Sequence, residues 1–308
     1  MGGVDAALLA LDWGTSSVRL TALAEDGTVL GSRSSQEGIL TVGQEPSAYA
    51  ITLDRLAGEW AAARPAVIAC GMVGSAKGWR EVPYLPTPVD LLEGATLTEV
   101  AGPWGPVHLV PGVSTRGGVM RGEETQLLGL VLAGYRDGVV ALPGTHTKWA
   151  SLAGGTLIDF HTAMTGELFA LLTTHGTLAQ VVGPPTAQPV DWAAFASGVE
   201  HGLAGAGLGA AALAFGVRAR ALLEQVPAEQ VREELSGVLI GSEIAGALHW
   251  LEHAPESVSV VASADLTERY RRALAVADLP CESAPAEVTA DALLHLARRA
   301  GLIEGETS

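Results

Sequence analysis

The stretch LALDWGTSSVRLTAL at residues 9–23 decides the fold of the first half of the chain. An apolar run ends at Asp12, a loop of small residues follows at 14–17, and an alternating segment comes next. Apolar runs on both sides of Asp26-Gly27 are typical of a β-hairpin. The sequence therefore predicts strand, small polar loop, strand, tight turn and strand over residues 7–32.

The same pattern returns in VVALPGTHTKWASLAGG at residues 139–155. The Gly-Thr pair precedes the turn glycine by 13 residues in the first copy, Gly14 to Gly27, and by 11 in the second, Gly144 to Gly155. Self-similarity of this kind indicates a repeated structural unit, here with a period of about 130 residues. We expect an α/β protein with a first domain at 1–135 and a second at 136–308.

Further elements follow from periodicity and helix-start signals. Pro46 stands where a helix tolerates proline, and the leucines after Glu123 have helical spacing. We expect strands at 66–70, 107–110 and 258–262. We expect helices at 46–62, 123–133, 166–175, 191–203, 210–225, 229–251, 266–277 and 286–300.

Composition excludes several classes of protein. Of 308 residues, 48% are hydrophobic, which excludes intrinsic disorder. The 18 basic and 34 acidic residues give a net charge of −16, so we do not expect nucleic acid as a partner. The apolar runs are too short to span a membrane, and no basic signal-peptide region opens the chain, so we expect a cytoplasmic protein. Two cysteines, Cys70 and Cys281, exclude a disulfide framework and a four-cysteine zinc site.

The two small-residue loops suit the binding of phosphate. Exposed backbone N–H groups and hydroxyls in such loops form concave anion sites. Either loop alone is better explained as an ordinary hairpin turn, but two matched loops at equivalent points of the repeat favour phosphate binding. Asp12 would repel a bare phosphate. Its position makes sense if a hydrated Mg²⁺ lies between the carboxylate and the phosphate. Glu123 and Glu124 open a helix, either as caps or as a general base. The chain's only two lysines, Lys77 and Lys148, lie in glycine-containing loops.

Seven stretches together resemble the 2-dehydro-3-deoxygalactonokinase family, within the superfamily of acetate and sugar kinases and actin. They are LDWGTSSVR (11–19), GMVGSAKGW (71–79), VMRGEETQLLG (119–129), LPGTHTKW (142–149), TAMTGELFALL (162–172), SGVLIGSEI (236–244) and LTERYRRAL (266–274). The resemblance implies a duplicated ribonuclease-H-like, actin-like ATPase fold of two domains with a cleft between them. It also implies ATP- and Mg²⁺-dependent phosphorylation of the 6-hydroxyl of 2-dehydro-3-deoxy-D-galactonate, in the degradation of D-galactonate.

The resemblance also implies roles for individual residues. The ATP phosphates and Mg²⁺ would meet Asp12, Gly14, Thr15, Ser16, Ser17, Gly144, Thr145, His146, Thr147 and Lys148. Gly241 would line the nucleotide, and the catalytic base would be Glu123 or Glu124, with Asp12 at the metal. The sugar acid would lie near Arg19, Gly74, Ser75, Lys77, Trp79, Tyr84 and Arg121.

Some of these assignments have alternatives. Arg19 or Lys77 would contact the substrate carboxylate, whereas Lys148 would lie near the phosphates. Trp79 and Tyr84 would either wall the sugar pocket or pack in a core. Ser263-Ala264 replaces a Gly-Thr pair that the family often carries, so the adenine contact departs from the pattern.

The function also has alternatives. One is another sugar or sugar-acid kinase on the same fold, and another is a non-catalytic nucleotide-binding regulator. The partners expected are a small sugar acid and ATP. The apolar helices around 203–224 would form either the interface of a homo-oligomer or a packing surface between the domains.

Overall fold

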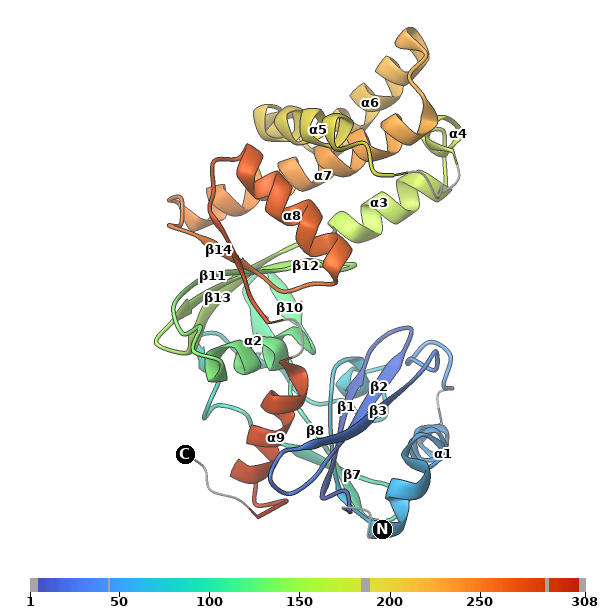
Figure 1. The fold of residues 1–308 in the computed structure, drawn as a ribbon, viewed down its shortest axis with the longest axis vertical. Coiled ribbons are helices and arrows are strands. Elements are labelled where there is room, and N and C mark those ends of the chain that lie inside the picture. The colour runs from blue at the N-terminus through green and yellow to red at the C-terminus, as the bar shows by residue number, and fades with distance from the viewer. Residues whose placement is uncertain (1–4, 44, 184–188, 286–287, 305–308) are drawn as a thin grey trace. The chain divides into compact units, whose positions relative to one another are not determined.

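The structure is a computed structural model that describes residues 5–43, 45–183, 189–285 and 288–304, and the chain forms two compact units. The first unit contains residues 1–137, 152–159 and 287–308. The second unit contains residues 138–151 and 160–286. The C-terminal segment thus belongs to the first unit, together with the N-terminal half of the chain. The elements of both units are labelled in Figure 1.

The first unit is built on a six-stranded sheet of order β3-β2-β1-β4-β8-β7. These strands are β1 (Leu8–Trp13), β2 (Val18–Leu23), β3 (Val29–Ser35), β4 (Ala66–Cys70), β7 (Thr98–Ala101) and β8 (Pro106–Leu109). β2 is antiparallel to its neighbours β1 and β3, whereas β1, β4 and β8 run parallel. The carboxyl ends of the parallel strands therefore lie at one edge of the sheet.

β1 is the central strand, and both of its faces are covered. Leu9, Leu11 and Trp13 pack in one hydrophobic cluster with Tyr49 and Leu53 of α1 (Pro46–Ala57). The other face of the sheet is covered by α9 (Thr289–Arg299), which contacts β1 and β4 (Figure 1). Burial on both faces explains why β1 is a continuous apolar run rather than an alternating one.

α2 (Glu123–Leu132) packs against α9 in the same unit. Gly129 makes this close contact possible, because a Cβ there would lie 2.2 Å from the carbonyl oxygen of Val288. A smaller sheet of order β10-β9-β5 leads into α2. Its strands are β5 (Leu85–Pro86), β9 (Val113–Thr115) and β10 (Gly118–Met120). β6 (Val89–Asp90) pairs instead with the first residues of β13.

The sheet of the second unit repeats the strand order of the first. Its order is β15-β14-β11-β12-β13-β6, in which β11 is the middle one of the first five strands and β14 and β15 run parallel to it. The strands are β11 (Gly138–Leu142), β12 (Thr147–Ala153), β13 (Thr156–Ala163), β14 (Val258–Val260) and β15 (Cys281–Ser283). Both sheets therefore place a small-residue loop between their first and second strands.

Helices make up most of the remaining second unit (Figure 1). They are α3 (Thr165–Thr174), α4 (Ala179–Val182), α5 (Trp192–Ala204), α6 (Ala210–Glu224), α7 (Ala228–Leu251) and α8 (Ala264–Val276). α5 and α7 pack so closely that their backbones are in direct contact. A Cβ at Gly198 would lie 2.2 Å from the Glu234 carbonyl oxygen, and one at Gly237 would lie 2.1 Å from that of Phe195.

Most of the expected elements are found close to their expected bounds. The hairpin at Asp26-Gly27 is confirmed: Gly27 has a φ of +90°, and Thr28 N–H donates to Asp26 Oδ1 at 2.8 Å. The helix expected over 46–62 is shorter, because α1 ends before Gly58 and a 3-10 turn follows. The expected start of the last helix at Ala286 lies outside the described residues. The sequence did not indicate the short helix α4 or six short strands, namely β5, β6, β7, β9, β10 and β15.

The contact between α5 and α7 gives a stability prediction. Gly237→Ala should lower the free energy of unfolding by about 1–3 kcal/mol, because the added methyl group forces two helix backbones apart. Gly246→Ala is a matched control on the same helix, since a Cβ there meets nothing within 4 Å. Urea unfolding followed by circular dichroism measures both. Equal destabilisation by the two changes would contradict the backbone contact.

Candidate active site

The loop after β1 is held in place by backbone hydrogen bonds. Gly14 N–H donates to the Ser17 carbonyl at 2.9 Å, and Leu40 N–H donates to that of Thr15 at 3.2 Å. Gly38 allows the second segment to approach, because a Cβ there would lie 2.3 Å from the carbonyl oxygen of Thr15. The side chains of Thr15, Ser16 and Ser17 are exposed. The loop is thus a fixed turn that offers three hydroxyl groups to the solvent.

Asp12 lies half-buried at the end of β1, beside two close backbone contacts. A Cβ at Gly71, which has a φ of +88°, would lie 2.8 Å from the carbonyl oxygen of Trp13 and 3.3 Å from Asp12 Oδ1. Gly122, with a φ of +111°, approaches Gly71 in turn, since its Cβ would lie 3.3 Å from Gly71 Cα. The two glycines therefore bring the end of β4 and the start of α2 up to Asp12.

Acidic side chains gather at this point. Burial raises the pKa of Asp12, Arg19 opposite it in the β1–β2 register lowers the pKa, and Glu123 raises it. The pKa of the Cys70 thiol lies well above its ordinary value because of burial, and Asp12 and Glu124 add to the rise. The carboxylates that the sequence singled out in two separate stretches, Asp12 in one and Glu123 and Glu124 in the other, are thus close enough to influence one another's protonation.

Glu123 and Glu124 both reach back to the backbone before α2. Arg121 N–H donates to Glu123 Oε2 at 2.9 Å, and Gly122 N–H donates to Glu124 Oε2 at 2.7 Å. The two acids therefore satisfy backbone donors at the helix start, as the capping interpretation predicts. Their surroundings differ, because the side chain of Glu123 is partly exposed whereas that of Glu124 is buried.

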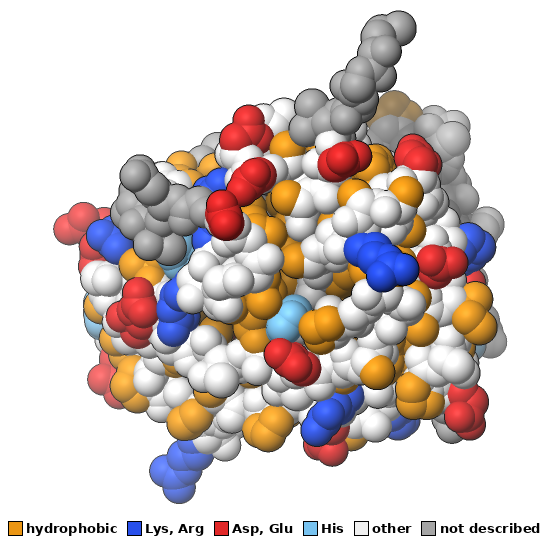
Figure 2. Space-filling model, turned by 90° about the horizontal axis from the view of Figure 1, so that it is seen from below, with side chains coloured by type: hydrophobic (Ala, Val, Ile, Leu, Met, Phe, Trp, Pro, Cys, Tyr) orange, Lys and Arg blue, Asp and Glu red, His pale blue; other side chains and the backbone are white. Residues whose placement is uncertain are grey.

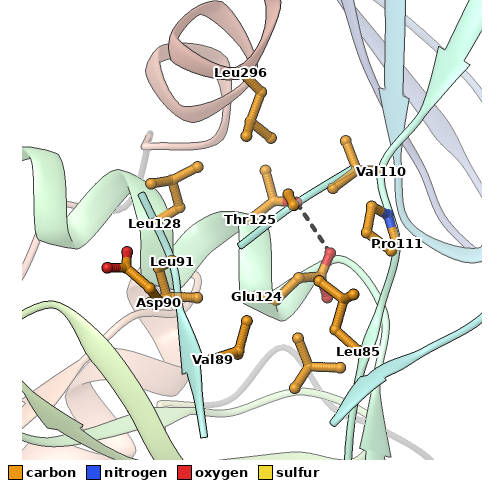
Figure 3. Close-up of a pocket in the computed structure, with 12 residues that line it drawn as sticks. Leu85, Val89, Asp90, Leu91, Val110, Pro111, Glu124, Thr125, Leu128 and Leu296 are labelled. Carbon is orange, nitrogen blue, oxygen red and sulfur yellow. Dashed lines mark hydrogen bonds between the residues drawn. The ribbon is translucent and has the colours of Figure 1, made fainter. Parts of the chain in front are cut away.

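Glu124 borders a small apolar pocket, shown in Figure 3. The pocket is lined mainly by Leu85, Val89, Leu91, Val110, Pro111, Leu128 and Leu296, and the Thr125 hydroxyl donates to Glu124 Oε1 at 3.0 Å. Burial and the neighbouring Glu123 raise the pKa of Glu124 to about 7. A carboxyl group with this pKa takes up and releases a proton near neutral pH, as a general base must.

Four of the residues expected at the sugar acid lie together. Arg121 is buried, its Nη2 donates to the carbonyl of Val82 at 2.7 Å, and its guanidinium carbon lies 4.2 Å from the ring centre of Tyr84. Gly74 leaves room for it, because a Cβ there would lie 2.9 Å from Arg121 Nη1. Ser75, the next residue, is buried as well.

The other three lie in different surroundings. Trp79 is buried in the hydrophobic core, stacked on Tyr49 with ring centres 5.6 Å apart, which is the core alternative that the sequence left open. Lys77 and Arg19 have exposed side chains. Contacts of these three with a sugar acid stay predictions.

In the second unit, the loop after β11 rests on the start of α3. A Cβ at Gly166 would lie 2.2 Å from the carbonyl oxygen of Gly144, and Glu167 N–H donates to that of Thr145 at 2.9 Å. The His146 ring pairs with the Glu167 carboxylate at 2.5 Å. Lys148 is buried, and its Nζ donates to the His146 carbonyl at 3.3 Å.

A buried carboxylate behind this loop was missed in the sequence analysis. Glu243 Oε1 accepts hydrogen bonds from Trp149 Nε1 at 2.9 Å and from the Tyr270 hydroxyl at 2.8 Å. The Tyr270 hydroxyl also meets the Thr147 hydroxyl at 3.0 Å. Burial raises the pKa of Glu243. The network ties β12 to α7 and α8. Its members lie in three of the stretches quoted above, LPGTHTKW, SGVLIGSEI and LTERYRRAL, but no pattern within them indicated that they meet.

Gly241 lies two residues from Glu243 in α7, where a Cβ would be 2.3 Å from the carbonyl oxygen of Val199. This position belongs to the contact between α5 and α7, so the structure gives Gly241 a packing role. Its contact with a nucleotide stays a prediction.

On the face drawn in Figure 2, basic side chains lie singly among acidic and apolar ones. Among the described helices, none is long and apolar enough to cross a membrane. Within the described residues, no three or more His, Cys, Asp or Glu side chains are grouped so as to hold a metal ion by themselves.

The raised pKa of Glu124 predicts a pH-dependent stability. The folded chain holds a proton on Glu124 up to a pH of about 7, whereas the unfolded chain releases it near 4.5. The stability of the wild type should therefore fall as the pH rises through this window, by about 3 kcal/mol relative to Glu124→Gln between pH 4 and 8. Denaturant unfolding across this pH range measures the difference. The exposed Glu229→Gln is the control, and parallel curves for wild type and Glu124→Gln would refute the prediction.

Comparison with known proteins identifies the relatives of the chain. The family model for 2-keto-3-deoxy-galactonokinase matches residues 12–296. A Rhizobium meliloti (strain 1021) protein named as a probable 2-dehydro-3-deoxygalactonokinase is 39% identical over 297 residues, which covers 94% of this chain and 96% of the relative. The Escherichia coli (strain K12) 2-dehydro-3-deoxygalactonokinase is 36% identical over 271 residues, with 86% and 88% covered.

A solved structure agrees with this relationship. A Sinorhizobium meliloti protein assigned as a 2-dehydro-3-deoxygalactonokinase superposes with a TM-score of 0.83 at 38% identity, covering 95% of this chain and 98% of that one. The match extends over both units rather than over one of them. The chain therefore belongs to the 2-keto-3-deoxy-galactonokinase family.

Proposed function

We propose that this protein transfers the γ-phosphoryl group of ATP to the 6-hydroxyl group of 2-dehydro-3-deoxy-D-galactonate. Family membership supports the substrate class, since the relatives named for this reaction match nearly the full length of the chain. The observation that carries the chemistry is Glu124, a buried carboxyl group with a pKa of about 7 beside Asp12 and Glu123. Phosphoryl transfer needs a positioned acceptor hydroxyl and charge neutralisation more than covalent help from the protein.

We assign Glu124 as the general base that takes the proton from the attacking hydroxyl. Its apolar surroundings and the charge of Glu123 favour its protonated form, so its affinity for a proton suits transfer near neutral pH. Glu123 then acts in two ways. It caps the start of α2 through Arg121 N–H, and its charge adjusts the proton affinity of Glu124.

The repeated strand order supports a duplicated ribonuclease-H-like, actin-like architecture. In this proposal the loop at 14–17 and the loop at 144–148 each bind phosphate groups of ATP. Exposed hydroxyls and glycine backbone suit that role in the first loop, and Lys148 adds a positive charge to the second. The carboxylate of the sugar acid needs a cation as well, for which Arg19, Lys77 and Arg121 are the candidates in the first unit.

The residues around Asp12 fit a magnesium ion that keeps much of its water shell. Carboxylate oxygens are the ligands that Mg²⁺ prefers, and the mutual repulsion of Asp12 and Glu123 is what a divalent cation would relieve. Asp12 would hold the ion, directly or through water, with the negative charge of Glu123 nearby. When bound, it would neutralise negative charge on the phosphate oxygens. Asp12 itself keeps its orientation through its place at the end of β1.

The direct test is a coupled assay of ATP turnover with a panel of 2-keto-3-deoxy sugar acids. The wild type should phosphorylate 2-dehydro-3-deoxy-D-galactonate with the highest kcat/KM. Glu124→Gln keeps the shape of the side chain but removes the base, so kcat should fall by about 10²–10⁴. Glu123→Gln should reduce kcat much less.

Two outcomes would contradict this proposal. A higher kcat/KM for another acid of the panel would show a different sugar-acid kinase of the same fold. Equal and mild losses of kcat in both glutamate variants would remove the base from this pair. Circular dichroism of each variant controls for loss of the fold.

Asp12 gives a separate prediction about the metal. Asp12→Asn should lower kcat by at least about 10²-fold and raise the Mg²⁺ concentration needed for half-maximal rate, because one charged oxygen ligand is lost. The melting temperature should not fall, since burial opposes the charged form of Asp12. Asp26→Asn, in the exposed hairpin turn, is the control. Normal activity of Asp12→Asn would exclude the assigned role.

A further inference from the structure

Arg121 is a buried cation that the first unit leaves largely unsatisfied. Its side chain is 7% exposed, and Nη2 makes its one side-chain hydrogen bond, to the carbonyl of Val82. Nε and Nη1 are buried and have no hydrogen-bond partner. Within the described residues, no carboxylate forms an ion pair with this guanidinium group. The nearby acids Glu123 and Glu124 instead accept backbone N–H groups.

Arg121 is enclosed on two sides. Gly74 lies against Nη1, because a Cβ there would be 2.9 Å from that nitrogen. The hydroxyl of the adjacent Ser75 is also buried without a hydrogen-bond partner. The ring of Tyr84 lies over the guanidinium, and this residue is 38% exposed, so it separates Arg121 from the solvent.

A buried charge without an anion is unfavourable, because the interior does not replace the lost hydration. The Tyr84 ring offers only part of the compensation that an anion would. Buried N–H and O–H donors without acceptors are also rare in native proteins. Two unsatisfied donors on Arg121 and one on Ser75 therefore indicate an anionic oxygen ligand that is absent from the chain itself.

We propose that Arg121, with the hydroxyl of Ser75, binds the carboxylate of the sugar acid, and that Tyr84 covers this subsite when the substrate is absent. The inference rests on the proposed function and selects among the three candidate cations. Arg19 lies opposite Asp12 in the strand register, and its charge acts on that carboxylate. Lys77 is exposed and can be satisfied by water. Of the three, only Arg121 is buried and has N–H groups without a hydrogen-bond acceptor.

The subsite would determine specificity for acids. A guanidinium group binds a planar carboxylate through charge-assisted hydrogen bonds, and a neutral sugar would leave the buried charge unpaired. The protein should therefore discriminate strongly between 2-dehydro-3-deoxy-D-galactonate and its primary amide, which has nearly the same shape and no charge.

The experiment measures KM and kcat for the acid and for its amide in wild type and in Arg121→Gln. The KM of the acid should rise about 100-fold in the variant, the KM of the amide should change by less than about threefold, and the KM of ATP should stay the same. Arg121→Lys should keep part of the preference for the acid, since it retains charge without the planar group. Ser75→Ala should raise the KM of the acid by about three- to tenfold only.

The controls separate binding from folding. Arg116→Gln removes an exposed arginine from the turn between β9 and β10 and should change none of these constants. A structural role of Arg121 would raise the KM of acid and amide alike, and that outcome would overturn the proposal. If Arg121→Gln does not fold, Ser75→Ala decides by the same comparison, and equal effects on acid and amide would again overturn it.

Failure of this inference and failure of the proposed function give different results. If the wild type phosphorylates the acid and Arg121→Gln still prefers the acid to the amide, the subsite is wrong and the function stands. If the wild type phosphorylates no sugar acid but binds 2-dehydro-3-deoxy-D-galactonate in calorimetry, and Arg121→Gln does not, the function is wrong and the subsite stands.

Discussion

The candidate site of the first unit depends on the contact between Gly71 and Gly122. Each has a positive φ, and neither has a side chain that would hold the end of β4 away from the start of α2. Because they approach so closely, the three acids Asp12, Glu123 and Glu124 share one region. A side chain at either glycine would move the helix start, and with it the carboxyl group whose pKa is near 7. The close approach of the Gly71 and Gly122 backbones thus sets the electrostatic environment of the three acids.

Both units use buried carboxyl groups, but for different physical purposes. Glu243 accepts hydrogen bonds from Trp149 and Tyr270 and thereby fixes the strand that follows the second loop. Glu124 borders an apolar pocket and lies beside Glu123, and burial together with that neighbouring charge raises its pKa to about 7. Two side chains of one type therefore serve separately as a structural acceptor and as a candidate base.

Sequence patterns predicted most strands of the two larger sheets and the hairpin, because these depend on local periodicity and turn chemistry. Asp26-Gly27 forms its turn through the conformation of glycine and a side-chain hydrogen bond, both of which are local. The network of Glu243 was not predictable, because its partners Trp149 and Tyr270 lie 94 and 27 residues away. The packing of α9 in the first unit was equally hidden, since its partner α2 lies more than a hundred residues earlier.

The sequence by itself determined the α/β class, the two small-residue loops and the set of acids and cations from which a site is built. Tertiary structure alone decided which of them are desolvated. Glu123 and Glu124 are adjacent and identical in type, and only packing against Leu85, Val110 and their neighbours makes Glu124 the buried one. In the same way, Arg121 is buried while Arg19 is exposed. Desolvation depends on contacts between distant segments, and it sets the proton affinity of an acid and the need of a cation for an anion.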